Sequence, residues 1–477
     1  MTGSWSMGAA RPERVVVVGA GMAGLVAARL LHDSGCQVTV LEARARLGGR
    51  TWTDDRLGAP LDLGGSWVHG VEGNPLALWC DKLGIALVES NADRLLIDER
   101  ATERTRDGQR RRAVLGRIAF RGAIAWHSWK SKAMARVWGP RSVSVKQAVD
   151  PLLSAPWLPL LDRLIITTFV EGSEGVQGAP YDAVAVEEWF PTEGLDGNAQ
   201  PRGGFRLLID DAQQGLDIRL NAPVARIAWG GEGVTVILQS GEKIAADRAI
   251  VTVPLGLLRA GLPSFDPPPP VEQQIAIGRL GYGAGVLGKI YLRFPHAFWP
   301  DKSKWFGRLP DSPQKRGTFN TFVSHLDETG LPILLSFANG HTAARLDRSA
   351  SDEEVKEVAM TSLRKMFGGN AVPEPEAFVF PRWLSDPWSR GGYSYPGVGS
   401  PTEDRETHAR PLGDRVFFAG EATEPVEYGT VHAALWSAEM AAEAIFKLAT
   451  GVAPSRDMRP WAGARTGAGR HNERRRA

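Results

Sequence analysis

Short apolar runs separated by glycine turns dominate the first forty residues of the chain. Residues 15–18 are four consecutive valines, and residues 25–31 are apolar apart from Arg29. A continuous apolar run of this length is typical of a strand buried on both faces, and a longer run after a glycine turn favours a helix. A second short run, 38–41, ends at Glu42. The pattern predicts strand, turn, helix and second strand, which is the start of a parallel α/β sheet.

The glycines between the first strand and the helix have the spacing G-x-G-x-x-G. In such a turn Gly19 permits the sharp bend, Gly21 lets the backbone approach a pyrophosphate, and Gly24 lets the helix pack closely on the sheet. Glu42 stands 23 residues after Gly19, close to the usual position of the acid that binds ribose hydroxyls. The sequence therefore predicts a dinucleotide without a 2′-phosphate, bound by Gly19, Ala20, Gly21, Met22, Gly24 and Glu42.

Two further glycine segments follow, at 44–53 and 61–70. The first places paired glycines between Arg44 and Arg50, and backbone amides beside a fixed cation suit a diphosphate. The alternative for this segment is a solvated glycine loop. The second segment brings amides and an aromatic ring together in a tight stretch. From the two segments we expect further cofactor contacts from Arg44, Gly49, Arg50, Gly65, Ser66 and Trp67.

Alternating and apolar runs continue through the second half of the chain. Short strands separated by glycine turns are expected at 218–220, 224–227, 234–238 and 250–254, as a return to the nucleotide domain. The run 286–294 alternates with Lys289 on one face, where a solvated lysine and a functional one fit equally well. Acids at 352–354 mark the start of a helix that runs to residue 367. A last strand ends at Glu421, and a helix that begins near residue 430 follows it.

Length, charge and cysteine content exclude several classes of protein. A chain of 477 residues is too long for one simple core, so two or three domains are expected. The net charge of +2 implies neither nucleic acid nor membrane as a partner. Two cysteines, outside any metal-ligand cluster, predict a reducing compartment and no metal site. The longest apolar stretches fall short of a membrane span, so we expect a cytoplasmic protein with flexible tails at 1–11 and 452–477.

Charge is unevenly distributed within that total. Residues 94–146 contain 14 Lys or Arg against 4 Asp or Glu, a net +10, with tryptophans among them. This segment is either a solvated helical part of a substrate domain or a docking surface for an acidic partner such as nucleic acid, which no recognised motif supports. Residues 171–201 contain seven acids and no Lys or Arg. They either attract a cationic amine or balance the basic segment at the surface, and the pattern singles out no one carboxylate.

Several separate motifs, in order, carry a family resemblance: 13–24, 44–53, 201–205, 251–256, Lys289, 382–387, 392–395 and 417–421. On these motifs the chain resembles the flavin-dependent amine oxidases, which include monoamine oxidases, polyamine oxidases and the related histone lysine demethylases. The match spans about residues 13–450 and is weakest between 91 and 200. It implies an α/β fold in which a Rossmann-like FAD-binding domain (12–90, 203–266 and 384–450) is interleaved with a mixed-sheet-plus-helices substrate domain (91–202 and 267–383).

The resemblance also assigns expected roles around the flavin. Lys289 is expected to hold a water against flavin N5 and to support reoxidation by oxygen, and Trp383 and Tyr393 to lie along the flavin and wall the amine pocket. Glu421 would bond the ribityl or diphosphate portion. By the same resemblance, backbone contacts would come from Val224 at the adenine side and from the Val431 amide at the pyrimidine end.

Two pocket positions depart from the monoamine oxidases. Thr430 stands where they have a second cage tyrosine, and His69 stands where some polyamine oxidases place a pocket histidine, for which a structural role is the alternative. The cysteine that bonds the flavin covalently in monoamine oxidases has no counterpart here. The resemblance therefore implies FAD bound non-covalently, with Lys289, Tyr393, Thr430 and His69 as the catalytic set.

The implied activity is removal of a hydride from the α-carbon of an amine. The imine product is hydrolysed, and O₂ is reduced to H₂O₂, as in polyamine and monoamine oxidases. One alternative is an L-amino acid oxidase, which would need a pocket arginine for the substrate carboxylate. Others are a specialised biosynthetic amine oxidase, a carotenoid-type desaturase, and a non-catalytic flavin-fold protein that binds an acidic partner through 94–146. We expect a small-molecule amine and O₂ as partners, and neither a membrane nor nucleic acid.

Overall fold

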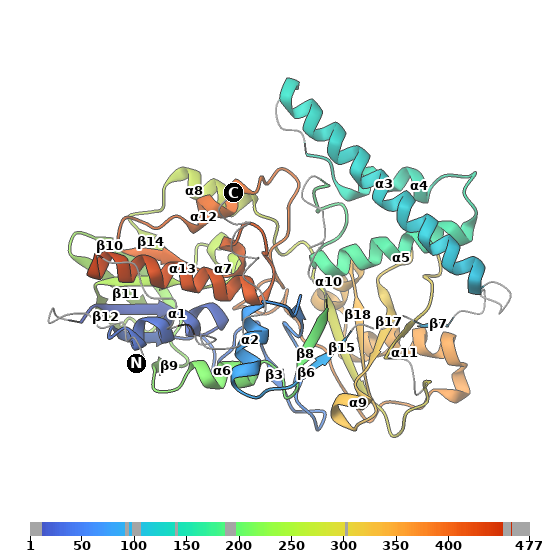
Figure 1. Ribbon diagram of the computed structural model, residues 1–477, viewed down its shortest axis with the longest axis horizontal. Helices are drawn as coiled ribbons and strands as arrows, with labels where there is room; N and C mark the ends of the chain where they lie inside the picture. Colours follow the sequence, from blue (N-terminus) through green and yellow to red (C-terminus); the bar gives the residue numbers. More distant parts are fainter. Residues whose placement is uncertain are drawn as a thin grey trace.

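The computed structural model describes residues 12–90, 95–97, 106–138, 142–186, 197–300, 304–451 and 459, with side chains in the long helix 106–138 described only for 114–130. The predicted tails at 1–11 and 452–477 lie outside these residues, residue 459 apart. The described chain forms two lobes, one around a parallel sheet and one around a larger mixed sheet (Figure 1). No helix in the described ranges is both long and apolar enough to span a bilayer.

The first lobe is built on a five-stranded parallel sheet in the order β20-β13-β1-β2-β9. Its central strand β1 (Arg14–Val18) pairs with β2 (Gln37–Leu41) on one side and β13 (Arg248–Val251) on the other. The edge strands are β20 (Val416–Phe418) and β9 (Asp217–Arg219). The predicted α/β start, with a strand, a glycine turn, a helix and a second strand, is confirmed.

The valines of β1 pack on both faces of this sheet because successive side chains of a strand point to opposite sides. Val15 and Val17 belong to the core formed with α1 (Met22–Asp33) and α13 (Val431–Thr450). Val16 and Val18 belong to a second core, which includes the four-stranded sheet. That sheet has the order β12-β11-β10-β14, from Lys243–Ala246, Gly233–Leu238, Val224–Gly230 and Ser264–Asp266.

The second lobe contains a six-stranded sheet in the order β19-β15-β18-β17-β16-β7. Strand β15 (Gly288–Arg293) lies inside it and is buried along nearly its whole length. Its two faces therefore pack in two different hydrophobic cores, and neither face is exposed to solvent. Ile290 and Leu292 belong to one core, and Tyr291 belongs to the other. The remaining strands are β19 (Ala377–Val379), β18 (Ile333–Ala338), β17 (Thr318–Ser324), β16 (Trp305–Gly307) and β7 (Leu95–Leu96).

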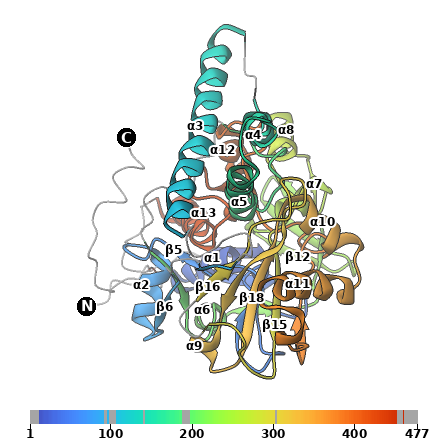
Figure 2. The same cartoon turned by 90° about the vertical axis from the view of Figure 1, so that its right-hand side faces the viewer.

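Helices cover this sheet and extend from it. Helices α10 (Gly340–Ser349) and α11 (Asp352–Phe367) contribute to the core beside it, and the Ser351 hydroxyl caps α11 as its acidic first turn suggests. Helix α3 (Arg106–Trp138) lies across α4 (Val145–Leu153) and α5 (Leu160–Gln177) and projects beyond the rest of the lobe in both views (Figures 1 and 2).

The chain passes between the lobes several times. Strand β8 (Asn198–Pro201) pairs with β5 (Val68–His69) and β6 (Leu87–Glu89), which joins the segment before the second lobe to the segment that returns from it. The domain boundaries given above stay predictions. The other described elements are β3 (Thr53–Asp54), β4 (Leu61–Asp62), α2 (Pro75–Lys82), α6 (Arg206–Ala212), α7 (Leu255–Arg259), α8 (Val271–Arg279), α9 (Leu326–Thr329), α12 (Glu403–Ala409), and the 3-10 turns Gly369–Ala371 and Glu421–Thr423.

Candidate active site

A cavity of about 780 Å³ runs from the glycine turn after β1 to helix α5 of the second lobe. Its wall includes the predicted catalytic set and all but two of the predicted cofactor residues. The two exceptions are Ala20, which is fully buried in the core, and Gly24. The lining residues predicted from the sequence are Gly19, Gly21, Met22, Glu42, Arg44, Gly49, Arg50, Gly65, Ser66, Trp67, His69, Val224, Lys289, Trp383, Tyr393, Glu421, Thr430 and Val431.

The glycines of the turn divide into two kinds. Gly19 has φ +107°, a backbone conformation that residues with a side chain rarely adopt. A Cβ on Gly24 would lie 1.8 Å from the Gly19 carbonyl oxygen. The protein's own fold therefore requires glycine at both positions. A Cβ on Gly21 would meet nothing closer than 3.8 Å, yet Gly21 lines the cavity and begins α1 without a side-chain cap. The open backbone and the uncapped helix N-terminus fit an anionic group such as a dinucleotide pyrophosphate.

Glu42 follows β2 at the same edge of the parallel sheet. Its two carboxylate oxygens each accept one backbone N–H, from Ala20 at 2.8 Å and from Arg44 at 2.9 Å. A carboxylate oxygen has two lone pairs, so each can also accept a hydroxyl proton. The carboxylate is therefore fixed in place at the cavity wall with capacity left to accept further hydrogen bonds, and its contact with ribose hydroxyls stays a prediction.

The two arginines of the first glycine segment are ion-paired rather than open to solvent. Arg44 forms a two-pronged pair with Asp386, at 2.7 Å for each hydrogen bond. Arg50 donates to Glu421 at 2.8 Å and to the carbonyl oxygen of Gly392 at 2.9 Å. Sequence reasoning missed both acidic partners because they are more than 300 residues away along the chain. The expected contacts of both arginines with a diphosphate stay predictions.

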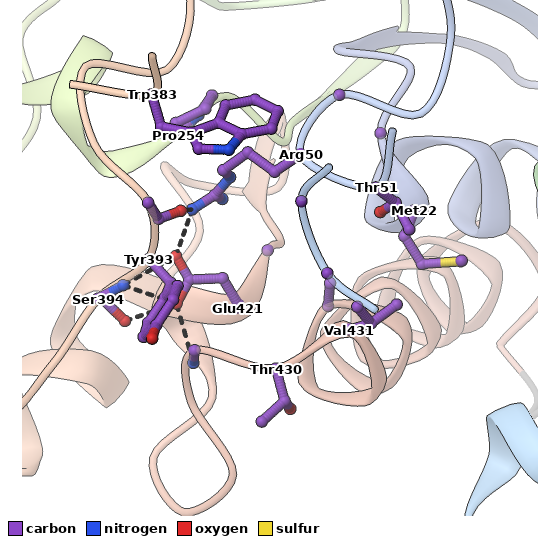
Figure 3. Close-up of a pocket in the computed structure, with 18 of the residues that line it drawn as sticks. Met22, Arg50, Thr51, Pro254, Trp383, Tyr393, Ser394, Glu421, Thr430 and Val431 are labelled. Carbon is purple, nitrogen blue, oxygen red and sulfur yellow. Dashed lines mark hydrogen bonds and ion pairs between the residues drawn. The ribbon is translucent and has the colours of Figure 1, made fainter. Parts of the chain in front are cut away.

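Glu421 organises the loops around it. Its carboxylate accepts from the Ser394 amide and hydroxyl, from the Gly429 amide at 3.0 Å and from Arg50 (Figure 3). Burial alone would raise the pKa of this carboxyl, but the positive charge of Arg50 and the Ser394 hydroxyl bring the pKa below its usual value. The acid is thus held ionised within the protein, while its predicted bond to the ribityl or diphosphate portion stays a prediction.

Thr430 is the N-cap of α13. Its hydroxyl accepts from the Ala433 amide at 3.1 Å and donates to the carbonyl oxygen of Glu427 at 2.7 Å. Figure 3 shows its side chain pointing away from the other labelled residues, while Val431 begins the helix at the cavity. The hydroxyl therefore has a structural task in the described chain, because it satisfies a backbone group at the helix end.

Lys289 is 5% exposed and is held behind the second glycine segment. Its Nζ donates to the Gly64 carbonyl oxygen and to the Ser66 hydroxyl, and it lies 4.8 Å from the centre of the Trp67 ring. Burial lowers the pKa of Lys289, and the carboxylate of buried Asp62 only partly offsets this effect. Of the two alternatives left by the strand pattern, a solvated lysine is wrong.

Aromatic side chains wall the cavity beside Lys289. The indole N–H of Trp383 donates to the Leu63 carbonyl oxygen at 3.3 Å, and the ring meets Trp52 edge-on. The Tyr393 hydroxyl donates to the carbonyl oxygen of Gly175 in α5 at 2.7 Å. These bonds use the polar atoms of both rings, so their flat apolar surfaces remain to shape the pocket.

His69 lines the same cavity from β5. Its Nδ1 lies 2.7 Å from the Asn198 side-chain oxygen on the paired strand β8, and this contact fixes the ring. Burial lowers the pKa of His69, which favours the neutral imidazole. Whether it contacts substrate stays a prediction.

The structure adds cavity residues that the sequence did not single out. Positions 168, 171, 172, 175 and 176 of α5 share one helical face, and that face lines the cavity. It carries Glu171, whose Oε1 accepts from the Gly317 amide at 2.7 Å and the Asn320 amide side chain at 2.9 Å. One turn on, buried Glu174 faces Arg316 at 3.4 Å. The only signal in the sequence was the run of acids at 171–201.

The chain matches a known family along most of its length. The family model described as flavin containing amine oxidoreductase matches residues 22–446. Polyamine oxidase 4 of Oryza sativa subsp. japonica is 33% identical over 449 residues, which cover 91% of this chain and 88% of that protein. Lysine-specific histone demethylase 2 of Homo sapiens is 32% identical over 426 residues, or 86% of this chain and 50% of that protein.

The chain therefore spans about half the length of that demethylase but most of the polyamine oxidase. Among solved structures, wild-type putrescine oxidase bound to putrescine is similar, with a TM-score of 0.71 and 23% identity, over 92% of this chain and 98% of that one. This similarity confirms the predicted fold.

Proposed function

This chain belongs to the family of flavin-containing amine oxidoreductases, and from that premise we propose that it is an FAD-dependent oxidase of small amines. The reaction removes a hydride from the α-carbon of the amine, gives an imine that water hydrolyses, and reduces O₂ to H₂O₂. One observation carries the proposal. A single cavity joins the dinucleotide-type glycine turn to an aromatic pocket that contains a buried lysine.

The residues of the cavity fit FAD along its length. Gly21 and the N-terminus of α1 would receive the pyrophosphate, Glu42 the ribose hydroxyls, and Trp383 and Val431 would flank the flavin. When bound, the flavin supplies the chemistry of accepting a hydride and returning electrons to oxygen. Both cysteines are buried in the hydrophobic core that contains α1 and line no part of the cavity, which supports non-covalent binding.

The aromatic walls prepare the amine for oxidation. Trp383 and Tyr393 exclude water from the pocket, and a desolvated site disfavours the ammonium form of a bound amine. The neutral amine keeps the nitrogen lone pair that stabilises positive charge developing at the α-carbon. Because the Tyr393 hydroxyl donates a hydrogen bond to the Gly175 carbonyl oxygen, the ring would present a fixed orientation to the substrate.

Lys289 supplies a group that can transfer protons during the second half-reaction, in which oxygen is reduced. Its burial favours the neutral amine, which can both donate and accept a proton at Nζ. The carbonyl oxygen of Gly64 and the hydroxyl of Ser66 hold Nζ in position while it does so.

The charges of the wall favour amines without a carboxylate. The arginines among the described lining residues are Arg44 and Arg50, and both are paired with carboxylates of the protein. An L-amino acid oxidase would need an arginine available for the substrate carboxylate. Glu171 instead places a carboxylate at the opposite end of the cavity, which suits the second ammonium of a diamine or polyamine.

The test is a peroxide-release assay on purified, yellow protein with monoamines, diamines, polyamines and L-amino acids, alongside anaerobic reduction of the flavin. We expect peroxide and bleaching with amines and neither with L-amino acids. Flavin that remains oxidised with every amine would overturn the proposal. Bleaching without peroxide in air would retain amine oxidation and reject oxygen as the acceptor. Acid precipitation should release the flavin as FAD into the supernatant.

A further inference from the structure

Helix α3 has two apolar faces on opposite sides. Positions 116, 120, 124 and 128 recur every four residues and are buried in the packing with α4 and α5, where Phe120 stacks on Phe169 at 6.2 Å. Because each residue turns the helix by about 100°, a second set of positions lies diametrically opposite. We call this set the outer face of α3: Leu115, Ile118, Gly122, Ala125, Trp126 and Trp129.

The outer face is exposed although none of its side chains is polar beyond the indole N–H groups. Leu115 is 64% exposed and Ile118 61%, and Trp126 and Trp129 are 59% and 62% exposed. The two indole rings lie against each other, with centroids 5.4 Å apart. Large apolar side chains gathered in one exposed stripe mark an interaction surface, whereas scattered ones need no explanation.

Positive charge surrounds this stripe. Helix α3 contains nine Lys or Arg and one Asp, a net charge of +8 over 33 residues. Among the described side chains, Arg121 lies on one side of the outer face and Lys130 on the other, and both are exposed. The helix also extends past the rest of its lobe in both views (Figures 1 and 2).

We propose that the outer face of α3 binds the surface of an anionic lipid bilayer. An apolar stripe with tryptophan, flanked by Lys and Arg, is the composition of a helix that lies in the membrane interface. The expectation of no membrane partner rested on the net charge of +2 and on the lack of a spanning segment. An interfacial helix needs no spanning segment, and the charge that attracts it to lipid is concentrated on α3. The site is separate from the cavity and does not depend on the proposed oxidase activity.

Other occupants fit the same observations less well. A second copy of the chain would bring two helices of +8 charge together, and like charges disfavour that contact. Nucleic acid would use the arginines but would leave Leu115 and Ile118 unburied. An anionic lipid surface accommodates both the apolar side chains and the positive charges. Its fluid interior also adapts to the difference in size between Trp126 and Gly122.

The experiment is flotation of the full chain with vesicles of phosphatidylcholine alone or with phosphatidylserine added. We expect binding to the anionic vesicles only, weakened by added salt. The variant Trp126→Ala/Trp129→Ala should abolish most of this binding, and Arg121→Gln/Lys130→Gln should weaken it by about fivefold for each charge removed. The matched control is Val271→Ala/Ile275→Ala, an exposed apolar pair on α8 that should bind like the wild type.

Flavin content and far-UV circular dichroism establish that each variant is folded before it is compared. The proposal is overturned by equal binding to neutral and anionic vesicles, by no binding, or by binding that both α3 variants retain. Dimers in light scattering that only the tryptophan variant loses would assign the outer face to a second copy. Retention of a DNA duplex without retention of vesicles would assign it to nucleic acid.

Discussion

The Nζ atom of Lys289 lies 4.8 Å from the ring centre of Trp67, in the wall of the cavity. The same nitrogen donates to Gly64 and Ser66, so one short glycine segment supplies every one of these contacts. Strand β15 of the second lobe carries the lysine, whereas the segment 64–67 lies more than 220 residues earlier in the chain. The position of this nitrogen therefore depends on how these two distant segments pack together.

Replacement of Lys289 by methionine should slow reoxidation of the reduced flavin by oxygen on the order of 100-fold, because a positioned proton-transfer group is lost. Anaerobic reduction by amine should change far less. Stopped-flow measurement of the two half-reactions separates these effects. The control is Lys304→Met, a half-buried lysine just before strand β16 of the same sheet, which pairs with Glu328 outside the cavity. Equal losses in both half-reactions would show that Lys289 only supports the fold.

Gly21 and Gly24 should respond differently to alanine. Gly24→Ala places a Cβ 1.8 Å from a backbone oxygen, and such overpacking should lower stability by about 1–3 kcal/mol or more. Gly21→Ala has room within the protein, so the flavin-free chain should unfold near the wild-type temperature while flavin affinity falls at least about tenfold. Thermal unfolding and flavin titration check both. Unchanged affinity in Gly21→Ala would reject this end of the cavity as the pyrophosphate site.

Glu171→Gln should raise the KM for putrescine by about 10- to 100-fold, because hydrogen bonds to charged groups contribute about 1.5–3 kcal/mol. Glutamine keeps the size of the side chain and an oxygen acceptor but removes the charge. The KM for butylamine, which has no second ammonium, should change little. Asp182→Asn removes an exposed acid nearby in the sequence and serves as the control for a general charge effect. Equal changes for both amines would reject the role of Glu171 in binding the second ammonium.

Two buried histidines should make the fold sensitive to mild acid. Burial lowers the pKa of His325 and of His408 to about 4, from a value near 6.5 in the unfolded chain. The unfolded state then binds more protons between these values. Their contribution to stability is thus full above about pH 6.5 and is lost as the pH falls toward 4.

Between pH 7 and pH 5, each of these two histidines should lower the free energy of unfolding by about 2 kcal/mol. The unfolding temperature of the His325→Gln variant should accordingly decrease less between pH 7 and pH 5 than that of the wild type. His341→Gln, at an exposed position, should show the wild-type slope. Identical slopes in all three proteins would show that His325 titrates normally.

The sequence by itself determined the strand, turn and helix with which the parallel sheet of this protein begins. The features that predict them are local: four valines, a glycine turn and a following acid. Val15 and Val16 pack on opposite faces of the sheet, and the missing side chain of Gly24 allows the helix to contact Gly19. Because the strand and the turn are built from neighbours in the chain, their spacing alone is enough to predict them. The family resemblance extended the prediction to the fold and to the residues around the cavity.

Only the tertiary structure decided which charges remain available. Arg44 and Arg50 appear as open cations in the sequence, but the fold pairs them with Asp386 and Glu421. Thr430 lines the cavity as predicted, and the fold also commits its hydroxyl to capping α13. Conversely, Glu171 was one acid among seven until α5 turned it to the cavity. Ion pairing, burial and pKa depend on residues hundreds of positions apart, and local sequence does not specify which of those residues meet.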